Sequence, residues 1–239
     1  MIYPRRVIEH VNELGVGAPR VGTLPTGAAV SVWSLDTTLE TVGGHRVSGI
    51  PPMLDGNERD RATRLLRAGD RQRYLASHIG LRVLLGAFLG RPPEEVTFHR
   101  EECPCCGEPH GRPAVTGGGV HFSLSHSDDL AYYAFAAVPV GVDVEAVPAE
   151  AAVADVLASL HPDETAELTA LADPEDRRLA LGRVWARKEA YFKGLGTGLA
   201  LGLSDPYIGS APTPAPVPDW TLTDLPTPPG YTAALALHT

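Results

Sequence analysis

The stretch WARKEAYFKGLGTGL (residues 185–199) places a lysine and a glutamate where the apolar face of a helix is expected. The apolar residues that share one face at helical spacing are Leu181, Val184, Trp185 and Phe192. Lys188 falls in the middle of this stripe, Glu189 lies at its edge, and Lys193 is one turn beyond Glu189. Burying an unpaired ammonium or carboxylate costs several kcal/mol, so these groups need partners. The fold must therefore supply either a structural ion pair or a bound ligand.

A second set of charges lies in the segment GVDVE (141–145). In a strand, Asp143 and Glu145 point to the same face, about 6.6 Å apart along the chain, while Val142 and Val144 fill the opposite face. Two aligned carboxylates repel each other unless a cation lies between them, and oxygen ligands of this kind suit Mg²⁺. The alternative is a strand with one solvated face. Glu189 could supply a third carboxylate from the helix.

The segment FSLSHS (122–127) ends a predicted strand just before a turn. Ser125 and His126 are neighbours, but adjacent strand residues face opposite ways, so Ser125 is poorly placed as a nucleophile activated by His126. A histidine that donates to a phosphate oxygen fits this position better. A purely structural histidine is the competing interpretation.

Two basic features stand out in an acidic chain. In HGRP (110–113), glycine frees the backbone and proline stiffens it around Arg112, which could bind a phosphate with two hydrogen bonds. The predicted helical region 57–90, broken near Ala68-Gly69, carries a basic cluster in its first half. The members of that cluster are Arg59, Arg61, Arg64 and Arg67.

The three cysteines all fall in the segment CPCCGEPH (103–110). Cys103 and Cys106 form C-x-x-C, and Cys105 and His110 are close in sequence, so a zinc knuckle is one reading. No second C-x-x-C exists, and free thiols in a surface loop are the expected state. An odd, clustered set of cysteines is a poor disulfide framework, so we expect a reducing, cytoplasmic compartment.

Composition excludes several function classes. The chain has 239 residues, 44% of them hydrophobic, a net charge of −9 and a pI near 5.4. A bulk nucleic-acid binder would show a basic surplus, so no nucleic-acid partner is expected. No apolar run reaches the roughly 20 residues needed to span a bilayer, and the first residues lack the apolar core of a signal peptide, so no membrane partner is expected.

Periodicity predicts a mixed succession of helices and strands. Residues 1–27 mix Gly, Pro and charge and are expected to be a loose leader, and the proline-rich stretch 211–229 is expected to be a loop or edge connection. The predicted strands are 28–38, 96–99, the three successive segments within 121–147, and 231–238. The predicted helices are 57–90, about 149–172, and a last one that starts at Asp173-Pro174 and ends at Gly194.

The order of these motifs resembles one known family. GVDVE, followed about forty residues later by W-x-x-K-E-A-x-x-K-x-x-G, is similar to the 4′-phosphopantetheinyl transferases. FSLSHS and GRP upstream match the longer, surfactin-synthetase-activating type, and the resemblance covers roughly residues 55–200. It implies an α+β fold of two similar α/β subdomains about a pseudo-twofold, with the active site in the cleft between them. The boundary is expected near Val140, giving a leader (1–27), an N-terminal subdomain (28–140) and a C-terminal subdomain (141–239).

The resemblance also implies a reaction. The 4′-phosphopantetheine group moves from coenzyme A to a serine of an apo acyl or peptidyl carrier protein, and 3′,5′-ADP is released. Coenzyme A is the co-substrate and Mg²⁺ the metal. Two fused halves favour a monomer. Whether the carrier serves polyketide, nonribosomal-peptide or fatty-acid synthesis is left open.

By the resemblance, five residues surround the diphosphate. Asp143, Glu145 and Glu189 would hold Mg²⁺. Lys188 and Lys193 would neutralise phosphate charge, with Lys193 nearest the transferring group. Glu189, acting directly or through water, is the candidate acceptor for the serine proton.

Four more residues are carried over to coenzyme A. Ser125 and His126 would contact its phosphates, with His126 counted among the catalytic groups. Arg112 stands where the family commonly has lysine and would bind near the nucleotide. Arg61 matches a basic position on the first helix of the family, and its expected contact is the 3′-phosphate.

Two other functions compete with the transferase. A magnesium-dependent phosphohydrolase that cleaves a nucleotide diphosphate would use the same carboxylates, with water as acceptor. A non-catalytic interaction module could be built on zinc bound by Cys103, Cys106 and His110. A gain of phosphopantetheine mass by an apo-carrier would distinguish the transferase from the phosphohydrolase. The metal content of the purified protein would test the zinc-based interaction module.

Overall fold

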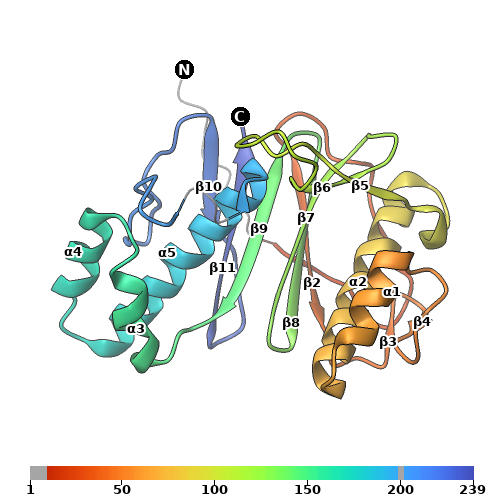
Figure 1. Cartoon of the computed structure of the whole chain (residues 1–239), viewed down its shortest axis with the longest axis horizontal. Helices are drawn as coiled ribbons and strands as arrows, with labels where there is room; N and C mark the ends of the chain where they lie inside the picture. The colour runs from red at the N-terminus through yellow and green to blue at the C-terminus, as the bar shows by residue number, and fades with distance from the viewer. Residues whose placement is uncertain (1–9, 199–201) are drawn as a thin grey trace.

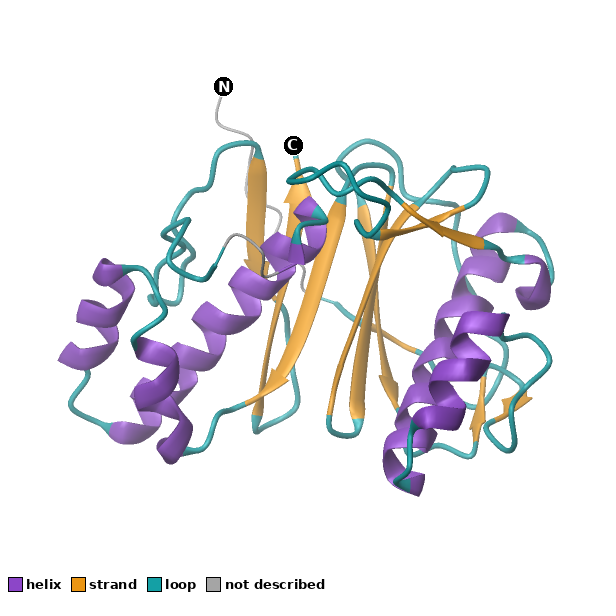
Figure 2. Ribbon diagram, viewed as in Figure 1, coloured by secondary structure: helices purple, strands orange, loops and turns teal. Residues whose placement is uncertain are grey.

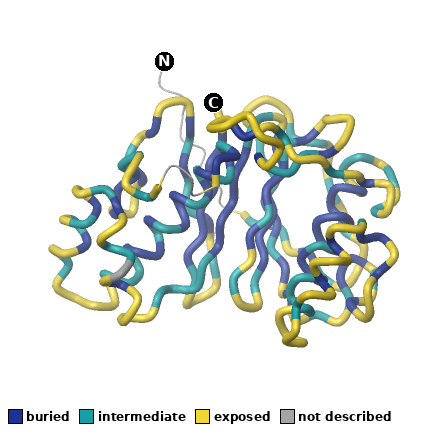
Figure 3. Tube along the Cα trace, viewed as in Figure 1, coloured by how far each residue is buried: buried dark blue, intermediate teal, exposed yellow. Residues whose placement is uncertain are grey.

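The computed structural model describes residues 10–198 and 202–239 as a mixed α/β fold (Figure 1). Two groups of strands stand side by side in the middle of the molecule, and helices cover the two opposite ends (Figure 2). Helix α5 lies along the sheet that contains β9 and β11, whereas α1 and α2 lie at the far end, beside β2, β7 and β8. The central strands are the most continuously buried part of the backbone trace (Figure 3).

The helices begin where capping chemistry favours them. Asp55 caps α1 and exchanges hydrogen bonds with Glu58, and Asp173 caps α5 just before Pro174. The helical segments of the described residues are α1 (Gly56–Arg64), α2 (Ala68–Leu89), the short 3₁₀ turn η1 (Pro93–Glu95), α3 (Glu150–Leu157), α4 (Pro162–Ala170) and α5 (Pro174–Leu195). None of the described helices is long and apolar enough to cross a bilayer.

The described strands form four sheets. The strands are β1 (Asn12–Glu13), β2 (Val30–Asp36), β3 (Thr41–Val42), β4 (His45–Arg46), β5 (Phe98–Arg100), β6 (Pro113–Val115), β7 (His121–Ser127), β8 (Leu130–Ala136), β9 (Val140–Ala146), β10 (Trp220–Asp224) and β11 (Tyr231–His238). One sheet has the order β1-β2-β8-β7 and another the order β10-β11-β9, while β3-β4 and β5-β6 are short hairpin sheets. All pairs are antiparallel except β1 with β2.

Serine side chains of β7 join the two larger sheets. The Ser123 hydroxyl accepts a hydrogen bond from the Val142 backbone N–H at 3.0 Å, and the Ser127 hydroxyl accepts one from Ala146 N–H at 3.1 Å. Ser125 lies between these two on the same face and bonds to the carboxylate of Asp143. Because serine recurs at every second position of FSLSHS, serine hydroxyls accept hydrogen bonds from backbone N–H groups at the edge of β9.

Glycine allows β9 to approach α5 closely. A Cβ atom added to Gly141 would lie 1.8 Å from the carbonyl oxygen of Ala190 and 2.5 Å from the backbone nitrogen of Gly194. On the other face of β9, Val142 and Val144 are fully buried in the core between the two sheets. This close approach brings Asp143 of β9 within hydrogen-bond distance of Lys193 in the last turn of α5.

Most predicted elements are present, with three differences. The strands over 28–38, 121–147 and 231–238 and the helix from Asp173 are confirmed, and the region 149–172 is helical but divides into α3 and α4. The expectation of a loop or edge connection over 211–229 misses β10, whose Trp220 and Leu222 pack on the inner face of α5. The expectation of a loose leader does not hold for residues 12–14, because β1 pairs with β2 and Leu14 is buried.

We predict that Gly141→Ala destabilises the fold by about 1–3 kcal/mol or more, because the added methyl collides with backbone atoms that cannot rotate away. Equilibrium urea unfolding followed by circular dichroism measures the change. Gly56→Ala is the matched control, since a Cβ there meets nothing within 4 Å. Equal stability of the two variants would contradict the proposed packing of β9 on α5.

Candidate active site

A cavity of about 1000 Å³ opens between the helices at one end of the molecule and the C-terminal turns of α5. Four of the residues expected to contact coenzyme A line it: Arg61 from α1, Arg112 just before β6, His126 from β7 and Lys193 from α5. These residues are far apart in sequence and come from both ends of the fold (Figure 1). The cavity is large enough for a nucleotide-sized ligand.

Beside this cavity, three side chains form a compact charged unit. The Lys193 ammonium donates to the Ser125 hydroxyl at 2.8 Å and to the Asp143 carboxylate at 2.5 Å. Ser125 in turn donates to the same Asp143 oxygen at 2.7 Å. Asp143 is 1% exposed, whereas the Lys193 side chain remains 31% exposed. Lys193 therefore links a buried acid to an accessible cavity.

The three predicted carboxylates share one electrostatic neighbourhood. Burial raises the pKa of Asp143, although the Lys193 charge opposes the shift. Burial, and then the negative charge of Asp143, raises the pKa of both Glu145 and Glu189. Glu145 also accepts a hydrogen bond from Ser127 at 3.1 Å. Concentrated negative charge of this kind is stabilised by a bound cation.

The donor set fits a hard divalent cation. All three groups offer carboxylate oxygens, which Mg²⁺ prefers, and the second carboxylate oxygen of Asp143 is buried with no hydrogen-bond partner. The oxygens of these three carboxylates do not all lie within 4.8 Å of one another. In the described part of the chain, the only three such ligand atoms that do belong to Cys103, Cys106 and His110. In this arrangement the Lys193 ammonium forms an ion pair with the buried Asp143 carboxylate and so compensates its negative charge.

His126 and Arg112 line the cavity in different ways. The pKa of His126 is lowered by desolvation and then by the charges of His78, Lys193 and Arg73, so its ring is neutral at neutral pH. Arg112 donates to Glu101 and to the Gly194 carbonyl, each at 2.7 Å. Arg112 thus ties its loop to the end of α5 while it contributes positive charge to the cavity wall.

The structure places Lys188 away from the cavity, and this corrects the expectation that it contacts phosphate. The Lys188 ammonium is fully buried, 3.0 Å from the Glu164 carboxylate, and it donates to the Pro206 carbonyl at 2.7 Å. Burial lowers the pKa of Lys188, and the Glu164 charge opposes this shift. The structural ion pair was the alternative interpretation of this helix, and it is the one the geometry supports.

Comparison with known proteins places this chain in a family. The model of the 4′-phosphopantetheinyl transferase superfamily matches residues 139–236. The 4′-phosphopantetheinyl transferase HetI of Nostoc sp. is 31% identical over 177 residues, which cover 72% of this chain and 73% of HetI. The chain belongs to the 4′-phosphopantetheinyl transferase superfamily.

Two further members of this superfamily show similar likeness. The 4′-phosphopantetheinyl transferase psf-1 of Bacillus pumilus is 30% identical over 162 residues, or 66% of this chain and 65% of psf-1. The 4′-phosphopantetheinyl transferase gsp of Aneurinibacillus migulanus is 27% identical over 145 residues, or 61% and 57% of the two chains. The matches with psf-1 and gsp thus span less than two thirds of those relatives' own length. These relatives carry the transferase name, and the phosphohydrolase alternative finds no support among them.

A buried network that the sequence did not reveal contributes Asp55, Glu58 and His78 to the lining of the cavity. Glu58 of α1 accepts from Arg82 of α2 at 2.8 Å and lies 3.0 Å from a ring nitrogen of His78. Arg82 is 1% exposed and also reaches Asp55 at 3.1 Å and the Val96 carbonyl at 2.7 Å. The signal that could have found this network was Arg82 within an apolar helix face, the same anomaly as Lys188 in α5.

The pKa of Glu58 predicts a pH-dependent contribution to stability. Burial raises this pKa, but the hydrogen bonds from His78 and Arg82 outweigh burial, so the folded pKa lies below the ordinary 4.5. A lowered acid pKa stabilises the fold above the unfolded pKa, and the stabilisation is lost as pH falls through the folded pKa. We expect Glu58→Gln to lower the free energy of unfolding at pH 7 by about 1.5–3 kcal/mol.

The difference between wild type and Glu58→Gln should shrink as the pH falls below 4.5 toward the lower folded pKa. Urea unfolding at a series of pH values measures it. Glu175→Gln is the control, because Glu175 pairs with Arg178 at the surface with 60% of its side chain exposed, and such pairs contribute about 1 kcal/mol or less. A difference that stays constant with pH would rule out the ionised Glu58 as its source.

Proposed function

We propose that this chain transfers the 4′-phosphopantetheine group of coenzyme A to a serine of an apo acyl or peptidyl carrier protein. The serine oxygen forms a bond to the phosphorus of the pantetheine phosphate. The bond from that phosphorus to the bridging oxygen breaks, and its electron pair leaves with 3′,5′-ADP. The serine proton passes to the enzyme or to solvent.

One observation carries this proposal. Lys193 joins the buried acid Asp143 to a large cavity that also holds Arg61, Arg112 and His126. Coenzyme A is a polyanion with a diphosphate and a 3′-phosphate, and charge-assisted hydrogen bonds from such side chains recognise phosphate oxygens. Arg61 and Arg112 suit the nucleotide end, and His126 and Lys193 suit the diphosphate. Ser125 holds Lys193 and supports its position toward the diphosphate.

Asp143, Glu145 and Glu189 would hold Mg²⁺. When bound, the ion would supply positive charge to the diphosphate and favour departure of the nucleotide phosphate. The unpartnered oxygen of Asp143 supports this assignment, as does the negative charge of Asp143, which raises the pKa of Glu145 and of Glu189. Lys188 is left out of the phosphate-binding set because its ammonium is used inside the fold.

Glu189 is the candidate acceptor for the serine proton, directly or through water. Its pKa is raised by burial and by Asp143, which makes the carboxylate a stronger base than an exposed glutamate. The same carboxylate would serve the metal, which weakens a base, so a bridging water is the better route. Phosphoryl transfer relies mainly on positioning and charge neutralisation.

We further propose the architecture that the family resemblance implies: two similar α/β halves about a pseudo-twofold, with the active site in the cleft between them. A boundary near Val140 agrees with the start of β9, where the second large sheet begins. The enzyme would act as a monomer in the cytoplasm, where its clustered cysteines remain reduced.

Carrier docking requires a local surface. The net charge of this chain is −9, and carrier proteins are generally acidic, so overall attraction does not favour the encounter. A basic or apolar patch near the mouth of the cavity would have to guide the carrier. The carrier could belong to polyketide, nonribosomal-peptide or fatty-acid synthesis, and a panel of apo-carriers in one assay discriminates among them.

Incubation with coenzyme A, Mg²⁺ and an apo-carrier should add the mass of phosphopantetheine to the carrier. We predict that Glu189→Gln slows this transfer by about 100-fold or more, as expected for a charged group that stabilises the transition state. His126→Ala should slow it less, by about 10- to 100-fold, because one charge-assisted phosphate contact is worth about 1.5–3 kcal/mol.

Glu175→Gln lies on the same helix, at its exposed start, and should transfer at the wild-type rate. Circular dichroism should show that Glu189→Gln folds normally, since its substitution relieves charge crowding. Near-normal transfer by folded Glu189→Gln would count against its role. Hydrolysis of coenzyme A without any gain of carrier mass would instead indicate the phosphohydrolase.

A further inference from the structure

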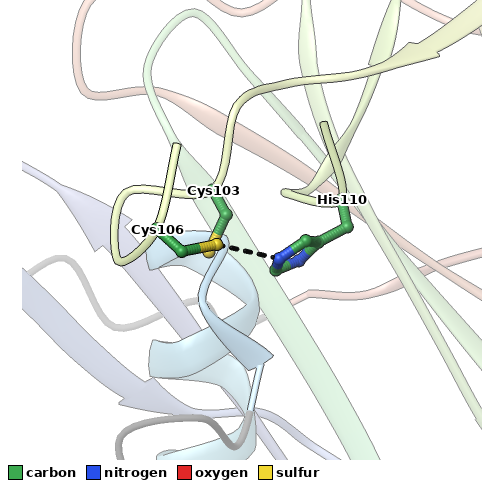
Figure 4. Close-up of side chains that lie close together, drawn as sticks. All are labelled: Cys103, Cys106 and His110. Atoms are coloured by element: carbon green, nitrogen blue, oxygen red, sulfur yellow. Dashed lines mark hydrogen bonds between the residues drawn. The ribbon is translucent and has the colours of Figure 1, made fainter. Parts of the chain in front are cut away.

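The loop between β5 and β6 gathers three soft ligands at one point (Figure 4). The sulfur of Cys106 lies 3.0 Å from Nε2 of His110. The sulfur of Cys103 joins them, and all three ligand atoms lie within 4.8 Å of one another. The sequence favours free thiols here. None of the three cysteines forms a disulfide, but free surface thiols do not explain why two of them converge on a histidine.

The backbone of this loop is built to hold the convergence. Gly107 follows Cys106 with a φ of 76°, and its N–H donates to the Cys103 carbonyl at 2.8 Å. The N–H groups of Cys103 and His110 both donate to the Glu108 carbonyl at 2.8 Å, which closes the loop on itself. A tight turn at C-P-x-C-G thus brings the two ends of an eight-residue segment together.

The loop backbone also holds the Cys103 sulfur in place, because the N–H groups of Cys105 and Cys106 point to it. Cys103 itself is buried with 2% exposure, so its sulfur is shielded on the protein side, while Cys106 and His110 are exposed and complete the site from outside.

We propose that Cys103, Cys106 and His110 bind a structural Zn²⁺ ion. With Zn–S near 2.3 Å and tetrahedral geometry, two ligating sulfurs lie about 3.8 Å apart, which is within the spacing of this cluster. Each thiol gives up a proton on binding, and the histidine ligates as the neutral ring. The Cys105 thiol contacts Cys103 but lies outside the group whose ligand atoms all fall within 4.8 Å of one another, so we assign the fourth position to water.

The position of this site indicates what it stabilises. His110 is followed directly by Gly111 and Arg112, and all three line the large cavity. Gly111 N–H donates to the Glu101 carbonyl at 2.9 Å, and Arg112 reaches across to Gly194 of α5. Zinc would fix the loop that carries Arg112 and thereby hold one wall of the cavity. This role makes the ion part of the fold rather than of the reaction, and it does not depend on the proposed function.

Metal analysis of the full chain tests the proposal. Protein produced with zinc in the medium and purified under reducing conditions should contain about one zinc per chain, measured by mass spectrometry of the elements. Cys106→Ser and His110→Gln should each reduce this to roughly a tenth or less. Both positions are exposed, so these variants should fold, and circular dichroism verifies it. Cys105→Ser is the matched control and should keep its zinc.

Cobalt substitution gives an independent readout. Co²⁺-loaded wild type and Cys105→Ser should show the visible absorption bands of tetrahedral thiolate coordination, and Cys106→Ser should lose them. Absence of metal from folded wild type at micromolar Zn²⁺, or zinc retained by both Cys106→Ser and His110→Gln, would overturn the proposal. Zinc lost equally from Cys105→Ser would overturn the three-ligand assignment. None of these outcomes depends on transferase activity.

Discussion

The close passage of β9 beneath α5 determines where the charged groups of this protein meet. At Gly141 a side chain would collide with the Ala190 carbonyl oxygen. At Gly194, near the end of α5, a side chain would collide with the ring of Trp220. At this separation Asp143 lies within hydrogen-bond distance of Lys193. A larger residue at 141 would push the helix away and separate the acid from the base. The chemistry proposed for this fold therefore depends on two backbones in contact.

Helix α5 uses its buried charges for two different purposes. Lys188 and Arg187 point into the protein and pair with Glu164 and Asp224, which anchors the helix to α4 and β10. Removing one partner of such a buried pair is strongly destabilising, whereas the intact pair adds little stability beyond a well-packed apolar alternative. Lys193, on another face and one turn beyond Glu189, remains partly exposed to the cavity. Exposure separates the structural lysine, Lys188, from Lys193, which we propose binds phosphate.

Local sequence was sufficient for much of the fold and for part of the site. Strands 121–147 carried alternation and turn residues, and Asp173-Pro174 marked the start of α5. The strand alternation of GVDVE also predicted that Asp143 and Glu145 share a face, and both accept from serines of β7. Strand β10 was not predicted because the sequence around it is rich in proline. Its residues form a strand because they pair with β11.

Burial and long-range pairing set the limit of sequence reasoning. The helical period identified Lys188 as anomalous but could not say which partner it meets, because Glu164 comes from a separate helix. The network around Glu58 was missed for the same reason, since Arg82 meets it only when α1 folds back on α2. Likewise, the ligand spacing of Cys103 and His110 depends on a turn geometry that composition alone does not specify.

The most direct test is a crystal structure of the chain with coenzyme A and Mn²⁺ in place of Mg²⁺, because anomalous scattering locates the manganese. The account predicts one ion bound by oxygens of Asp143, Glu145 and Glu189, with the diphosphate beside Lys193. An ion bound elsewhere, or a diphosphate far from these acids, would contradict it.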